Sequence, residues 1–271
     1  MAFMITDDNV KIFYTDKGTG KPIVFVHGWA SNGAGFLTPV RHLKNKYRVI
    51  TIDLRGNGSS DIPDNGITIE RCATDLEQLL NNLNLDEVTL IGWSMGAQIV
   101  LEYVNNYGCK RLKGVGIIDM TPKLINDEYW NLGLYHGKFT YKDTLEALAH
   151  MNRDWISFTE DFYKIVAPHF TEKDMVAIRY DNKLVKPNVP IDMWIDMSTK
   201  DYREMLGNIS VPAVIMYGEA STLYSKGTAE YMYSKIPKSK LICFEGCSHL
   251  LVLDNPDKFN KVVEDFVENG L

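Results

Sequence analysis

A serine flanked by glycines is the residue of this chain best suited to nucleophilic chemistry. Residues 92–96 read Gly-Trp-Ser-Met-Gly; they follow the apolar run 88–91 and precede a helix-forming segment that extends to Tyr107. A serine at the tip of a strand-to-helix turn adopts a strained, positive-φ backbone, and the turn closes only where its neighbours have little or no side chain. The strain exposes the serine oxygen above a sheet. We therefore predict that Ser94 is a nucleophile.

A second loop is suited to stabilise negative charge on a reacting oxygen. The buried-type strand 22–26 runs directly into His27, Gly28 and Trp29. A glycine in such a loop lets the backbone approach a ligand, and a backbone amide there can donate to an oxyanion. The sequence predicts an oxyanion hole formed by the backbone N–H groups of Trp29 and Met95.

The general base is expected near the C-terminus. Residues 240–245 have the pattern of a strand, and the loop after them, Gly246 to His249, contains a glycine and ends on a histidine. A histidine just past a late strand lies where it can reach the serine, so we predict that His249 is the base. The remaining five histidines are interpreted as surface or packed residues: His27, His42, His136, His150 and His169.

Taken together and in order, these motifs resemble those of the α/β-hydrolase superfamily, in particular cap-bearing serine esterases and cofactor-free haloperoxidases. The matching segments are residues 27–29, 53–60, 92–96, 246–249 and 255–256. The resemblance implies a mostly parallel eight-stranded sheet with helices on both faces and a helical cap after strand 6. It also implies a core made of residues 1–121 and 209–271, a cap of residues 122–208, and chemistry without cofactor or metal.

The hydrophobic periodicity independently indicates strands that alternate with helices, which is typical of a parallel sheet covered on both faces. Active sites of such sheets lie at the carboxyl ends of the strands. The strands are expected at 10–16, 22–26, 47–53, 88–93, 113–119, 211–217 and 240–244, and the helices at 36–45, 69–83, 98–107, 227–235 and 256–268.

The segment 122–208 interrupts this alternation. It has helical patterns at 143–152, 159–166 and 172–180, and it is rich in aromatic residues and methionines. If the segment is a lid, a few of these side chains face the serine and make the pocket apolar and adaptable. The sequence does not indicate which ones.

The acid that orients the histidine is the open question. In most relatives an aspartate lies three residues beyond the glycine after strand seven, but this chain has Ser221 there. Asp119, at the end of strand six, is our preferred acid, because some family members take their acid from that point. Glu219 is the alternative, and a dyad or a non-catalytic site is the third possibility. Asp254 is expected to cap the last helix and Asp53 to hold the turn after its strand.

Composition excludes several classes of function. The chain has 271 residues, 45% of them hydrophobic, and a net charge of −6, which argues against nucleic acid or an anionic membrane as the main partner. No long apolar run or leader-like start is present, so a cytoplasmic location is expected. The four cysteines have no common metal or redox spacing and are expected to be reduced.

The predicted function is hydrolysis of a small-to-medium apolar carboxylic ester through an acyl-serine intermediate. Lactone, thioester, amide or C–C bond hydrolysis by the same serine is the alternative. A ligand receptor on the same scaffold, with little turnover, is the alternative from another class, favoured only by the missing acid at position 221. The oligomeric state is left open.

Overall fold

The computed structural model describes residues 2–182 and 185–270. It contains one sheet of eight strands in the order β1-β2-β4-β3-β5-β6-β7-β8, and every neighbouring pair from β4 to β8 is parallel. Only β2 runs against the others, pairing antiparallel with β1 and β4. The strands are β1 (Ala2–Ile5), β2 (Lys11–Lys17), β3 (Pro22–Val26), β4 (Arg48–Ile52), β5 (Val88–Trp93), β6 (Leu112–Ile118), β7 (Ala213–Gly218) and β8 (Ser239–Phe244).

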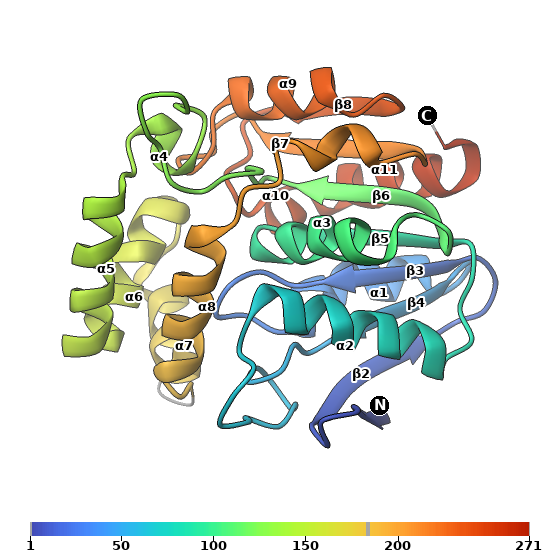
Figure 1. Ribbon diagram of the computed structural model, residues 1–271, viewed down its shortest axis with the longest axis horizontal. Helices are drawn as coiled ribbons and strands as arrows, with labels where there is room; N and C mark the ends of the chain where they lie inside the picture. Colours follow the sequence, from blue (N-terminus) through green and yellow to red (C-terminus); the bar gives the residue numbers. More distant parts are fainter. Residues whose placement is uncertain (1, 183–184, 271) are drawn as a thin grey trace.

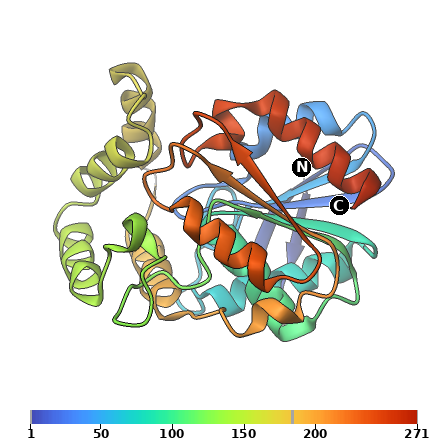
Figure 2. The ribbon, with the colours of Figure 1, turned by 90° about the horizontal axis from the view of Figure 1, so that it is seen from above.

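Helices cover both faces of the sheet, as Figures 1 and 2 show: α1 and α11 lie on one face, and α2, α3 and α9 on the other. The predicted fold class is therefore confirmed, and the element boundaries agree with the predicted ones to within a few residues. The helices of these layers are α1 (Leu37–Leu43), α2 (Ile69–Asn82), α3 (Met95–Tyr107), α9 (Lys226–Lys235), α10 (Leu251–Asp254) and α11 (Pro256–Asn269).

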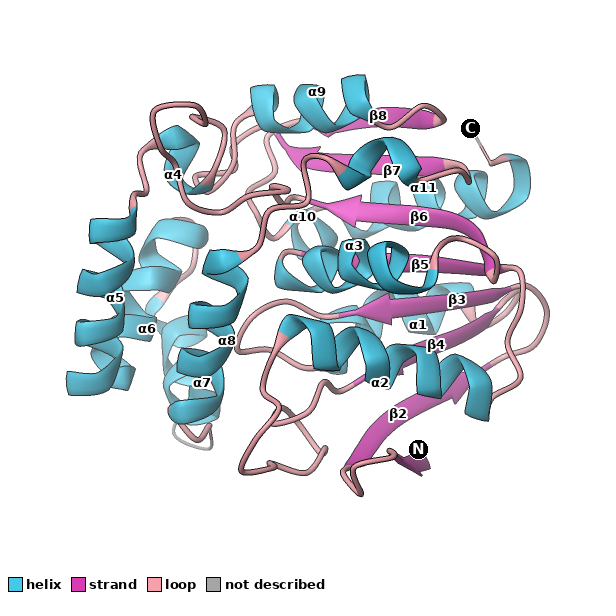
Figure 3. Cartoon of the chain, in the orientation of Figure 1, coloured by secondary structure: helices cyan, strands magenta, loops and turns pink. Residues whose placement is uncertain are grey.

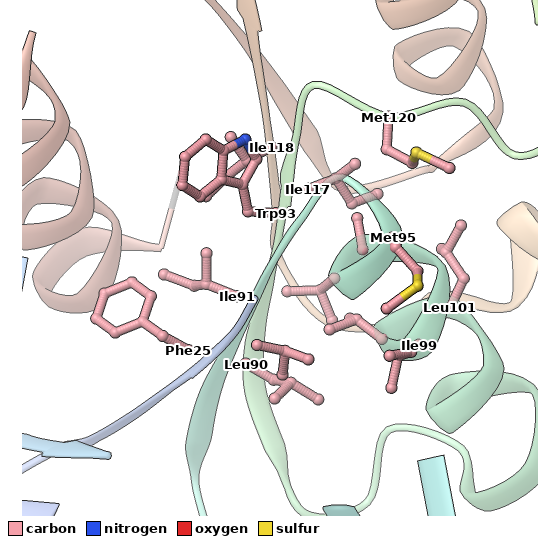
Figure 4. Close-up of a cluster of buried hydrophobic side chains, with 14 of the residues drawn as sticks. Phe25, Leu90, Ile91, Trp93, Met95, Ile99, Leu101, Ile117, Ile118 and Met120 are labelled. Atoms are coloured by element: carbon pink, nitrogen blue, oxygen red, sulfur yellow. The ribbon is translucent and has the colours of Figure 1, made fainter. Parts of the chain in front are cut away.

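The strands of the core are buried on both sides because their sequences are almost continuously apolar. Every residue of β5 and β7 is buried. Figure 4 shows Phe25, Ile91 and Trp93 on one side of the central strands and Ile99 and Leu101 of α3 on the other. This two-sided core fixes the strand ends, and with them the loops that carry the chemistry.

Between β6 and β7 the chain forms a group of helices beyond the carboxyl ends of the strands (Figure 3). Three of them, α5, α6 and α7, were predicted from the sequence, whereas α4 and α8 were not. In the structure Pro190 lies in the first turn of α8, where a helix needs no donated N–H bond. These helices are α4 (Leu134–Gly137), α5 (Tyr141–Arg153), α6 (Trp155–Val166), α7 (Glu172–Asn182) and α8 (Asn188–Thr199).

No helix of the described residues is long and apolar enough to cross a membrane. Within the same residues, the four cysteines are free thiols.

The loop after β4 is anchored by a buried ion pair. The Arg55 guanidinium, whose side chain is fully buried, donates through Nε and Nη2 to the two carboxylate oxygens of Asp75 on α2, at 2.6 and 2.8 Å. A charge without its partner is costly to bury, so both members of the pair are needed to keep this loop in place.

We expect Asp75→Asn to lower the free energy of unfolding by about 3 kcal/mol, because the buried Arg55 charge is then left with the more exposed carboxylate of Asp8, 3.0 Å from its Nη1, as counter-charge. Urea unfolding followed by circular dichroism measures the change. Glu230→Gln, which removes the solvent-exposed pair between Lys226 and Glu230, is the matched control and should cost no more than about 1 kcal/mol. Equal losses in the two variants would contradict this account of the buried pair.

Candidate active site

Ser94 occupies the turn between β5 and α3 with a strained backbone, φ 55° and ψ −127°. The flanking glycines are required by sterics. A Cβ on Gly92 would lie 2.3 Å from the carbonyl oxygen of Gly96, and a Cβ on Gly96 would lie 2.2 Å from the carbonyl oxygen of Val26. The predicted elbow geometry is thus present, and it leaves Ser94 partly exposed between buried neighbours.

The loop after β3 lies against this turn. A Cβ on Gly28 would be 3.1 Å from Cβ of Ser94, so only glycine allows this approach without a shift. The loop brings Trp29 to the same pocket as Ser94. Met95 is the first residue of α3, where the backbone N–H has no intrahelical acceptor. The structure thus places both residues of the predicted oxyanion hole next to Ser94.

The side chain of His27 stabilises this loop through two hydrogen bonds to backbone groups. Its ring is fully buried; Nδ1–H donates to the carbonyl oxygen of Gly28 at 2.8 Å, and Nε2 accepts from the backbone N–H of Leu54 at 3.0 Å. These bonds require the neutral imidazole, and burial lowers the pKa of His27, against a smaller opposing effect of the Gly28 carbonyl and of Asp53. His27 is packed, as the sequence analysis predicted.

His249 and Asp119 form a buried hydrogen-bonded pair. Nδ1–H of His249 donates to Oδ2 of Asp119 at 2.7 Å, and the residues are 5% and 2% exposed. Asp119 follows β6 with a positive φ of 41°, and its backbone N–H is bound to the carbonyl oxygen of Met216. Because Asp119 holds the proton on Nδ1, Nε2 of the neutral ring is left as the basic nitrogen.

The alternative acid lies elsewhere. The carboxylate of Glu219 accepts from the backbone N–H of Gly246 at 3.0 Å and is exposed, so it supports the loop before His249 rather than the ring. Of the two carboxylates weighed from the sequence, only Asp119 is hydrogen-bonded to His249.

The expected role of Asp254 was wrong. Its carboxylate accepts from both the backbone N–H and the hydroxyl of Ser248, at 2.7 Å each, and so fixes the loop that carries His249. The cap of α11 is Asn255, whose side chain accepts from the N–H of Lys258. The chain ends α10 at Asp254 and bends at the next residue, which places Asn255 at the N-cap.

Asp53 holds the turn after β4, as predicted. Its two carboxylate oxygens accept from the backbone N–H groups of Gly33 and Ser59, each at 2.8 Å. A Cβ on Gly58 would lie 2.1 Å from the same carboxylate, so the turn requires glycine there.

Ser94 and His249 line one pocket of about 240 Å³. Its wall is predominantly apolar and comes from both the sheet side and the helices after β6. The remaining lining residues are Gly28, Trp29, Ser31, Gly35, Trp93, Phe162, Tyr163, Val166, Phe170, Ile178, Leu250 and Leu253.

Aromatic packing joins the helices after β6 to this pocket. The ring of Trp29 lies 5.1 Å from that of Trp194 and 5.5 Å from that of Phe162, and its Nε1–H donates to the carbonyl oxygen of Pro190 at 2.7 Å. Of the aromatic residues that the sequence placed in a lid, three line the pocket: Phe162, Tyr163 and Phe170.

Sequence reasoning missed two hydrogen bonds of Ser221. The Ser221 hydroxyl donates to Oδ2 of Asp119 at 2.7 Å, and the His136 ring contacts the carbonyl oxygen of Ser221, also at 2.7 Å. The signal for the first was the unusual serine at a position where relatives carry an aspartate. His136 carried no such signal and was interpreted as a surface or packed residue.

The described residues contain no group of three or more His, Cys, Asp or Glu side chains placed to hold a metal ion.

Comparison with known proteins identifies the family. The model of the alpha/beta hydrolase fold family matches residues 21–256, so the chain belongs to that family. It is 28% identical to the non-heme chloroperoxidase CPO-A1 of Kitasatospora aureofaciens, over 98% of this chain and 99% of that protein.

Solved structures show the same likeness. An esterase from Exiguobacterium antarcticum superposes with a TM-score of 0.91 at 28% identity, covering 98% of this chain and 99% of that one. A bromoperoxidase from Bacillus anthracis gives a TM-score of 0.88 at 29% identity, with 96% of each chain covered.

His27 makes stability pH-dependent. Because its folded pKa is lowered from 6.5, its contribution to stability is complete above that value and is lost as the pH falls, by at most about 1.4 kcal/mol per pH unit. We expect His27→Gln, which keeps an acceptor for Leu54, to be less stable at neutral pH but to lose less stability than wild type between about pH 7 and pH 5. Urea unfolding at both values gives the two slopes; identical slopes would contradict the buried neutral ring.

Proposed function

We propose that this protein is a serine hydrolase that cleaves carboxylic esters through an acyl-enzyme intermediate. The observation that carries the proposal is that the strained Ser94 and the Asp119-supported His249 line the same apolar pocket. A serine with a histidine base favours acyl transfer to water. Similarity to an esterase over almost the whole chain supports the same reaction class.

In the proposed reaction Ser94 Oγ attacks the ester carbonyl carbon while Nε2 of His249 takes its proton. Asp119 stabilises the imidazolium, and the N–H groups of Trp29 and Met95 bind the oxygen that becomes negative. The bond to the alcohol oxygen then breaks, and His249 returns the proton to that oxygen. Water, activated by the same histidine, attacks the acyl-serine and releases the acid.

The pocket supports a small-to-medium apolar substrate. Its volume is about 240 Å³, and its walls from the helices after β6 are aromatic or aliphatic. We propose that residues 122–208 act as a cap on a core of residues 1–121 and 209–271, and that the cap sets the size of the acyl group accepted. The proposed ligand is an uncharged small ester, rather than nucleic acid or a membrane.

A second activity is favoured by the relatives named chloroperoxidase and bromoperoxidase. An acyl-serine can be attacked by hydrogen peroxide in place of water, which gives a peracid from the same intermediate. Ser94, His249 and Asp119 would act in both reactions, so perhydrolysis needs no further residue. Lactone, thioester and C–C bond hydrolysis would also begin at Ser94.

We expect the protein to hydrolyse p-nitrophenyl esters of short and medium acyl length, and Ser94→Ala to lower kcat by at least about 10³-fold. Initial rates across the acyl series measure this and give the chain-length optimum. Peracid formation is assayed on the same samples with added peroxide. Thermal stabilisation by an ester without any turnover would instead indicate a receptor.

Two matched variants test whether Asp119 or Glu219 is the acid that supports His249. Asp119→Asn should lower kcat by roughly 10³- to 10⁴-fold, because the amide cannot stabilise the imidazolium or hold the required tautomer. Glu219→Gln removes a carboxylate only two residues from Ser221 and should stay near wild type. A large loss in Glu219→Gln with a normal Asp119→Asn enzyme would overturn the assignment.

A further inference from the structure

The Ser221 hydroxyl has a fixed direction. Its Oγ receives the backbone N–H groups of Leu223 and Tyr224, at 3.3 and 3.4 Å, and lies 2.7 Å from Oδ2 of Asp119. With the two amides donating to it, the hydroxyl proton points at the carboxylate. Accepted hydrogen bonds also polarise a hydroxyl and make it a stronger donor. Ser221 is 3% exposed, so water does not compete freely for these bonds.

Ser221 and His249 bind the same carboxylate oxygen. Oδ2 of Asp119 accepts both bonds at 2.7 Å, while Oδ1 receives the longer N–H contact of Gly218 at 3.3 Å. The two donors therefore fix the rotation of the carboxylate and share its negative charge. The histidine experiences a carboxylate that is already partly neutralised by the serine.

His136 holds the backbone of Ser221 from the helices after β6. Its ring Nε2–H donates to the carbonyl oxygen of Ser221 at 2.7 Å, and its backbone N–H donates to the carbonyl oxygen of Leu223 at 3.1 Å. The donated ring bond is available to both the neutral and the protonated imidazole, so this contact does not depend on the charge of His136.

The conformation that allows this contact is costly. Tyr135 and His136 both have left-handed backbones, with φ of 53° and 54°. Consecutive non-glycine residues in this region are disfavoured and persist only where the surroundings enforce them. Here the two bonds from His136 to the loop that bears Ser221 help to hold the turn, together with the backbone bonds from Gly137 to Gly133 and from Lys138 to Tyr135.

We propose that Ser221 is a positioning residue for the acid Asp119, and that the segment Leu134–Gly137 of the cap holds it in place through His136. This inference rests on the proposed function. In this inference, Ser221 determines how strongly Asp119 stabilises the imidazolium of His249. That stabilisation in turn depends on the position of the cap, through His136.

Removing the Ser221 hydroxyl should shift the pH dependence of kcat/KM in a definite direction. Without the Ser221 donor the Asp119 carboxylate carries more charge toward Nδ1 of His249, which favours the imidazolium. The acidic limb of the kcat/KM profile of Ser221→Ala should therefore move to higher pH, by roughly half a unit, and kcat/KM at its plateau should fall about tenfold because the carboxylate is no longer held in one rotation.

The other titratable side chains near His249 are retained in this variant. They are Tyr224, whose ring lies 6.0 Å from that of His249 and whose pKa is raised by burial and by Asp119, and the pair of His169 and Asp254 beyond Ser248. A shift of the acidic limb in Ser221→Ala thus reports on the Asp119 carboxylate.

The role of the cap is tested with His136. We expect His136→Ala to shift the limb in the same direction by a smaller amount, and to add no further shift when combined with Ser221→Ala. His136→Gln keeps an N–H donor and should restore most of the wild-type profile. His150→Ala, in the same group of helices but directed at Ser157 and Phe158, is the control and should leave the profile unchanged.

A second readout separates this inference from the proposed function. The downfield Nδ1–H proton of His249 in ¹H NMR reports its bond to Asp119 and its titration without any substrate. The signal should titrate at higher pH in Ser221→Ala. Ser221→Cys, which keeps the side-chain size with a weaker donor, gives the same readout if the alanine variant fails to fold.

An unshifted acidic limb together with an unshifted Nδ1–H titration would overturn the role of Ser221. Additive shifts in the double variant would overturn the link through His136. If no ester is hydrolysed but the NMR titration moves as expected, the proposed function fails while the positioning role of Ser221 stands.

Discussion

The candidate site depends on backbone approaches at the carboxyl ends of the strands that leave no room for a Cβ atom. Gly96 packs against the carbonyl oxygen of Val26, Gly28 against Ser94, and Gly218 against the carbonyl oxygen of Ser248, where a Cβ would lie 2.1 Å away. These contacts bring together the ends of β3, β5 and β7 and the loop after β8. Protein interiors are close-packed and resist small shifts. The glycines are therefore the reason that loops distant in sequence meet with the accuracy that proton transfer requires.

Strain at two of these strand ends has a common form. Ser94 after β5 and Asp119 after β6 both have positive φ, at 55° and 41°. Each residue turns out of its strand at once, which directs its side chain toward the pocket side instead of into the covering helices. Such strain lasts only where the surroundings fix it. Here the N–H of Ser94 binds the carbonyl oxygen of Ile118, and that of Asp119 binds the carbonyl oxygen of Met216, so each strained residue is tied to the next strand.

Much of this arrangement was predictable from the sequence because it is local. Continuous apolar runs mark buried parallel strands, and the glycines around Ser94 mark a sharp turn. The helix α8 was not predicted, although its prolines are compatible with a helix, because Pro187 is the N-cap and Pro190 lies in the first turn. The contacts of Ser221 with Asp119 and His136 join residues 102 and 85 positions apart. No pattern along the chain encodes such pairs, and Asp254 was misassigned because its partner Ser248 becomes adjacent only when α10 turns back on the loop.

The proposed role of Asp119 as the acid is compatible with the geometry of the sheet. Strands β6 and β7 are parallel neighbours in register, with Ile118 beside Met216, so a carboxylate at the end of either strand lies on the same side of the pocket. A histidine after β8 can donate a hydrogen bond to a carboxylate at the end of either strand without a change of fold. In this chain the carboxylate is that of Asp119, after β6, and Ser221, after β7, donates a hydrogen bond to it. Ser221 and His249 both bind Oδ2 of Asp119. The bond from His136 connects that pair to the helices that form the pocket wall, and in the role proposed for Ser221 it links the position of those helices to the charge near His249.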